Sequence, residues 1–114
     1  MEIIKLRDTV IKALQEKNGL DIKAVNLDGR TIIADYFIIA TGNNGPHLRA
    51  LADYTEEQLE ANGVSPLRKE GVGEGRWIVL DYGSIIVHLF NRESRDYYCL
   101  EKLWGNGDNI TVFN

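Results

Sequence analysis

Cysteine is almost absent from the chain, since Cys99 is the only one in 114 residues. A single thiol forms neither an internal disulfide nor one of the zinc sites that need several cysteines. The two histidines, His47 and His88, are too far apart for the common metal-ligand spacings. We therefore expect a protein of the reducing cytoplasm, with no metal site and no cofactor.

Long hydrophobic runs are also missing. The longest uninterrupted apolar run has five residues, from Tyr36 to Ala40, whereas a membrane-spanning helix needs about 20. Met1 is followed directly by a charged helical pattern without the features of a signal or transit segment. The sequence thus predicts an untargeted, soluble protein that does not interact with membranes.

The chain also has no excess of basic residues. The chain has 13 Lys and Arg against 17 Asp and Glu, a net charge of −4. Proteins that bind nucleic acid gain much of their affinity from clustered Lys and Arg. Tight direct binding to RNA or DNA is therefore not expected, and a protein or a small molecule is the favoured partner.

The length fits one domain at about 100–200 residues per domain, and the periodicity of apolar residues predicts three helices and about five strands. The expected helices cover residues 2–17, residues 46–62, and a stretch from Asn91 or Ser94 to about Trp104. The expected strands cover residues 22–27, 31–41, 68–70, 77–80 and 85–90. Helices before, between and after two groups of strands indicate a single α/β domain with a mixed sheet packed by helices.

Local signals add detail to this fold. The dipeptide Asp28-Gly29 predicts a tight hairpin turn between the first two strands. The strand that follows is almost continuously apolar, which is typical of a central strand covered on both faces. We expect the domain to occupy residues 1–104 and a C-terminal tail to occupy residues 105–114. Within this tail, residues 110–113 have strand propensity but no local partner.

The loop from Gly42 to Pro46 is the feature most like that of an enzyme. A strand, a glycine-bearing turn and a helix start can direct backbone N–H groups at a phosphate. A magnesium-dependent nucleotidyltransferase also needs two or more carboxylates on adjacent strand positions, whereas Asp35, Asp53 and Asp81 stand apart along the chain. We interpret the loop as an ordinary capped helix start and keep the enzyme as the weaker alternative.

An aromatic surface is the stronger candidate site. Alternation along the strand at residues 85–90 puts His88 and Phe90 on one face, and alternation along the preceding strand groups Trp77 with Asp81. If the two sets share a face, they form an aromatic surface with polar groups. Such a set is either a covered core with a hydrogen-bonded His88 or a protein-binding surface, and the residues alone leave both open.

The last predicted helix adds to this surface. Tyr97, Leu100 and Trp104 recur at helical spacing and are expected to pack partly on the core, and Cys99 is expected inside the helix as a packing residue. No catalytic residues are assigned. The candidate partner-binding residues are Trp77, Asp81, Tyr82, His88, Arg95, Tyr98, Leu100, Glu101 and Trp104.

Several sequence blocks, in order along nearly the whole chain, resemble the ribosomal silencing factor family, also called the Iojap family. They are DYFIIATG at residues 35–42, HLRA at 47–50 followed by Ala52-Asp53, Glu70-Gly71, WIVLDYG at 77–83, VHLF at 87–90, and RxYYxLExLW at 95–104. The chain departs from the family at residues 43–46, where serines are usual, and at Cys99, where an aspartate is common.

This resemblance implies a nucleotidyltransferase-like fold without catalytic carboxylates, and a binding protein in place of an enzyme. It implies attachment to the large ribosomal subunit through the fourteenth large-subunit ribosomal protein, with steric block of small-subunit joining and repression of translation. It further implies a homodimer off the ribosome and a role of organelle members in large-subunit assembly. A dimeric scaffold without ribosome affinity is the remaining alternative.

Overall fold

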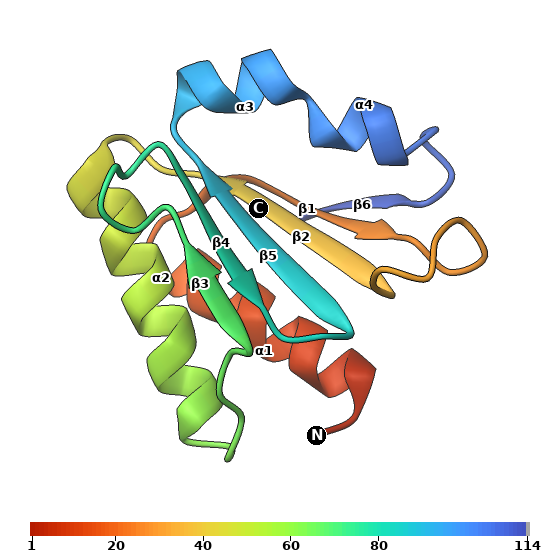
Figure 1. The fold of residues 1–114 in the computed structure, drawn as a ribbon, viewed down its shortest axis with the longest axis horizontal. Helices are drawn as coiled ribbons and strands as arrows, with labels where there is room; N and C mark the ends of the chain where they lie inside the picture. Colours follow the sequence, from red (N-terminus) through yellow and green to blue (C-terminus); the bar gives the residue numbers. More distant parts are fainter. Residues whose placement is uncertain (114) are drawn as a thin grey trace.

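The computed structural model describes residues 1–113, which form one six-stranded mixed sheet with helices on both faces (Figure 1). The elements in chain order are α1 (Ile3–Glu16), β1 (Leu20–Asn26), β2 (Tyr36–Thr41), α2 (Gly45–Glu60), β3 (Arg68–Glu70), β4 (Trp77–Asp81), β5 (Ile85–Phe90), α3 (Arg92–Tyr98), α4 (Leu100–Trp104) and β6 (Ile110–Phe113). The strand order is β3-β4-β5-β2-β1-β6. The expected α/β class with a mixed sheet is therefore confirmed.

The sheet is built around β2 and β5, which pair in parallel, whereas β1 pairs with β2 and β4 pairs with β5 in antiparallel fashion. Phe37 to Thr41 of β2 are all buried, so the prediction of a central strand covered on both faces is confirmed. The sheet has one strand more than expected because β6 pairs with β1. Strands from opposite ends of the chain leave no local signal of their pairing.

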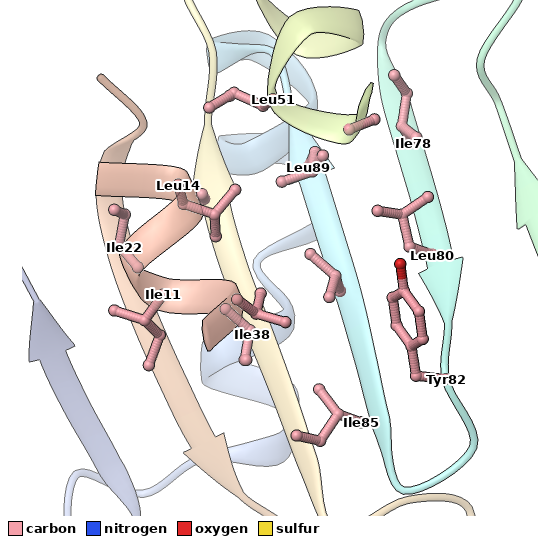
Figure 2. Close-up of a cluster of buried hydrophobic side chains, with 14 of the residues drawn as sticks. Ile11, Leu14, Ile22, Ile38, Leu51, Ile78, Leu80, Tyr82, Ile85 and Leu89 are labelled. Carbon is pink, nitrogen blue, oxygen red and sulfur yellow. The ribbon is translucent and has the colours of Figure 1, made fainter. Parts of the chain in front are cut away.

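Helices α1 and α2 cover one face of the sheet and enclose the main core (Figure 1). Figure 2 shows Leu14 of α1 and Leu51 of α2 among the side chains of Ile38 and Leu89 from the central strands. The start of α2 is capped as predicted, since the Asn44 side chain accepts a hydrogen bond from the backbone N–H of His47. The apolar stripes of both helices thus face the core that their spacing predicted.

The expected strand at residues 31–41 is wrong in its first half. Leu27 bonds through its backbone N–H to the Asp35 carbonyl, and its own carbonyl accepts from Arg30 and Thr31, so a loop of residues 27–35 joins β1 to β2. Ile32, inside this loop, is fully exposed. β-branched residues favour a strand only where a partner strand and a packing surface meet them, and the loop has neither.

The expected single C-terminal helix is also wrong, because it breaks at Cys99. The backbone of Cys99 lies in the left-handed region, with φ of 47° and ψ of 51°, and α4 starts immediately after it. Helical spacing therefore does not extend across Cys99. As a result, Tyr97 is exposed while Leu100 is buried, although the spacing placed them on one stripe.

Gly71 follows β3 at a point where the backbone comes very close to β4. Its φ of 80° is left-handed, and a Cβ atom there would overlap the carbonyl oxygen of Trp77. Gly63 has a similar φ of 77° but open space around it. We expect Gly71→Ala to lower the free energy of unfolding by about 3 kcal/mol and Gly63→Ala by about 1 kcal/mol. Urea denaturation measures both, and equal losses would contradict the steric account.

Candidate functional site

The candidate site lies on the sheet face that α3 and α4 cover only in part. The register of β4 and β5 sets Trp77 opposite Phe90 and Val79 opposite His88. The ring centroid of Trp77 lies 5.8 Å from that of His88 and 5.0 Å from that of Phe90. The prediction that the two alternating sets share a face is thus confirmed.

Side chains from other elements extend this group into an aromatic cluster, defined by Phe37, Trp77, His88, Phe90, Tyr98 and Trp104. Tyr98 of α3 lies over Trp77 at a centroid distance of 4.6 Å. Trp104 of α4 meets Phe37 edge-on at 5.9 Å, and Phe37 in turn meets His88 at 4.7 Å. Phe37 was missed in the sequence because only the parallel pairing of β2 with β5 brings it here.

The exposed fraction of the side chains increases from one end of the aromatic cluster to the other. His88 and Phe90 are buried, Trp77 and Trp104 are partly buried, and Tyr98 is 46% exposed. Tyr97 next to Tyr98 is also exposed. The covered core with a hydrogen-bonded histidine is therefore confirmed at His88, the aromatic side chains are accessible at Tyr98, and a protein-binding surface there stays a prediction.

His88 lies beneath Trp77 and accepts a hydrogen bond from it. Its Nδ1 accepts a hydrogen bond of 3.1 Å from the indole N–H of Trp77. Burial lowers the pKa of His88 to about 4, so the ring is neutral at pH 7 and carries its proton on Nε2, which has no partner among residues 1–113. His88 thus orients Trp77, and its own ring is not accessible to a partner.

Arg95 and Glu101 lie at the inner side of α3 and α4. Arg95 is only 4% exposed, and its Nε donates to the Glu101 carboxylate over 2.8 Å. Burial raises the pKa of Glu101, but hydrogen bonds from its own backbone N–H and from Arg95, with the charges of Arg95 and Lys23, hold it below its usual value. Leu100 between them is buried as well.

Asp81 and Tyr82 are not part of the aromatic cluster. Asp81 lies at the far end of β4, where it accepts a hydrogen bond from the backbone N–H of Gly83 and pairs with Arg68 at 3.3 Å. Tyr82 is buried in the opposite layer, in line with Leu80 (Figure 2). Burial, followed by the charges of nearby glutamates, raises the pKa of Tyr82. The structure therefore separates these two residues from the other candidates.

A shallow cavity of about 250 Å³ adjoins Tyr98 beside α3. Its lining is Arg76, Asn91, Glu93, Ser94, Tyr97 and Tyr98. Glu93 and Asp96 add two exposed carboxylates along the same helix. The accessible end of the aromatic cluster is therefore bordered by a concave surface of mixed charge, in which exposed Arg76 and Arg92 accompany the two carboxylates.

The loop from Gly42 to Pro46 uses its hydrogen-bond donors internally. The backbone N–H of Asn43 donates to Nδ1 of His47 over 2.9 Å, and that of His47 donates to the Asn44 side chain over 2.8 Å. Within residues 1–113, no three His, Cys, Asp or Glu side chains gather where they could hold a metal ion. Of the helices in the same part of the chain, none is long and apolar enough to cross a membrane.

Comparison with known proteins gives consistent results. Residues 1–113 match the family described as "Ribosomal silencing factor during starvation". "Ribosomal silencing factor RsfS" of Bacillus subtilis (strain 168) is 39% identical over 94 residues, which cover 82% of this chain and 80% of that protein. A crystal structure from Chromobacterium violaceum superposes with a TM-score of 0.90 at 34% identity, covering 93% of this chain and 89% of that one.

A more distant similarity extends to mitochondria. The mouse protein named "Mitochondrial assembly of ribosomal large subunit protein 1" is 31% identical over 100 residues, which cover 85% of this chain and 44% of that protein.

The buried His88 predicts a pH dependence of stability. Its pKa falls from 6.5 to about 4 on folding, so its contribution is complete above pH 6.5 and is lost as the pH falls toward 4, by about 3 kcal/mol in all. His88→Gln keeps an acceptor for Trp77 and does not titrate. Denaturant unfolding from pH 7 to 4 should therefore show a steeper loss for the parent protein, whereas parallel curves would contradict the assignment.

Proposed function

The chain belongs to the ribosomal silencing factor family, and on that premise we propose that it binds the large ribosomal subunit and sterically blocks joining of the small subunit. Translation is thereby repressed. The observation that carries the proposal is the accessible end of the aromatic cluster, where Trp77, Tyr97 and Tyr98 lie together on one face. Aromatic side chains that are partly packed and partly exposed are typical anchors of protein interfaces.

The proposed contact on the subunit is its fourteenth large-subunit ribosomal protein. A net charge of −4 suits a basic partner, because complementary charge speeds encounter. The same acidic balance disfavours direct contact with RNA phosphates. This chemistry supports a protein contact in the cytoplasm, with the neighbouring small-subunit surface excluded by the bulk of the domain.

Two further roles belong to the proposal. Off the ribosome the chain forms a homodimer. The likeness to a mitochondrial large-subunit assembly protein supports a second role in large-subunit biogenesis. No catalytic step is proposed, in keeping with a family and relatives that are named as silencing factors.

A subunit-joining assay tests the function. The protein is added to purified large subunits before small subunits, and whole ribosomes are quantified on a sucrose gradient. The expected result is fewer whole ribosomes, with no effect on ribosomes joined beforehand. Normal joining at saturating protein would refute the proposal, and dimers that fail to co-sediment with large subunits would indicate a scaffold instead.

Tyr98 is the residue whose truncation should separate binding from folding. Tyr98→Ala removes a 46% exposed ring from the proposed interface, and we expect a loss of about 2 kcal/mol in binding, roughly thirtyfold. Ile4→Ala on α1 is the matched control, since Ile4 is 42% exposed in the opposite layer. Co-sedimentation with large subunits measures binding. Equal affinities of the two variants would show that Tyr98 is not part of the interface.

A further inference from the structure

The junction between α3 and α4 needs an external constraint. Cys99 lies there in a left-handed conformation that L side chains rarely adopt, and it persists only where surrounding structure enforces it. The two helices have seven and five residues, too few for either to be stable alone. Contacts across the junction must therefore fix its geometry.

A buried ion pair supplies that constraint. Arg95 of α3 donates through Nε to the Glu101 carboxylate of α4 over 2.8 Å, so the pair spans Cys99. The same guanidinium donates to the Thr41 hydroxyl over 2.9 Å and to the Asp21 carbonyl over 2.9 Å. One planar side chain therefore ties both helices to the ends of β2 and β1.

The position of the pair connects it to the aromatic cluster. Tyr98, immediately before the junction, packs against Trp77 with the ring planes tilted by 42°, and Trp104, at the end of α4, packs against Phe37. A change in the angle between α3 and α4 would displace at least one of these rings. The ion pair thus controls where the accessible aromatic side chains lie.

We propose that Arg95 and Glu101 are positioning residues, whose ion pair across Cys99 holds Tyr98 in the orientation that a partner binds. The proposal rests on the function proposed above and reassigns two residues that the sequence indicated as direct contacts. Arg95 is 4% exposed and the Glu101 side chain 14%, so neither offers a partner a free charged group. Lys23, 3.7 Å from Glu101, adds a second cation to the same carboxylate.

The test compares two Glu-to-Gln changes at ion pairs of similar burial in opposite layers of the fold. Glu101→Gln weakens the pair across the junction while nearly preserving shape. Glu56→Gln on α2 is the matched control, because the Glu56 side chain is 15% exposed and pairs with Lys69 at 3.2 Å in the opposite layer. Both variants are assayed well below their melting temperatures. The first measurement is the affinity for large subunits. The second is the NMR ring-proton shifts of Tyr98, which report how Tyr98 packs against Trp77.

For Glu101→Gln we expect altered Tyr98 shifts and about tenfold weaker binding, equivalent to ~1.4 kcal/mol, while Glu56→Gln changes neither. Glu101→Asp, which keeps the carboxylate, should recover part of both signals and provides the comparison if Glu101→Gln does not fold. Weaker binding with unchanged Tyr98 shifts would make Glu101 a direct contact and overturn the proposal. So would unchanged binding.

The proposed function can fail separately. If the parent protein does not bind large subunits, that function is wrong, and the Tyr98 shifts alone then decide the positioning role. A shift difference confined to Glu101→Gln supports it, whereas identical spectra of the two variants overturn it.

Discussion

The burial of one guanidinium governs the half of the molecule that carries the candidate site. A buried charge is tolerated only when it is paired and hydrogen-bonded, and Arg95 meets this condition by joining Glu101, Thr41 and the Asp21 carbonyl. The face under α1 and α2 is closed by a large apolar core, whereas α3 and α4 cover a smaller buried cluster that includes Phe37, Phe90 and Leu100. On this face the hydrogen bonds of Arg95 therefore add to a smaller apolar cluster, whereas the opposite face is held mainly by its large apolar core.

The arrangement leaves the aromatic cluster buried at one end and open at the other. His88 accepts the indole N–H of Trp77 from beneath, which fixes the ring without exposing a titratable group at neutral pH. Tyr98 extends the cluster to the surface, next to side chains of both charges on α3. A docking surface of this kind loses little side-chain entropy on binding, because its anchor rings are already packed against one another.

The sequence predicted what local alternation determines. The shared face of Trp77 and His88 follows from a hairpin of neighbouring strands. The grouping of Tyr82 with this face was wrong, because Tyr82 follows the end of β4 and packs in the opposite core. The sequence could not predict the pairing of β6 with β1, because the two strands lie at opposite ends of the chain. Nor did spacing show the break at Cys99 or the burial of Arg95, since an arginine on a helix flank ordinarily points to solvent and only the folded sheet ends supply its acceptors.

The central claim is that the surface formed by α3, α4 and the start of β4 docks on the large ribosomal subunit. Hydrogen–deuterium exchange of the chain, free and bound to purified large subunits, tests it most directly. The account predicts slower exchange on binding in residues 92–104 and at the start of β4, with little change in α1 and α2. Slower exchange confined to α2, with residues 92–104 unaffected, would contradict it.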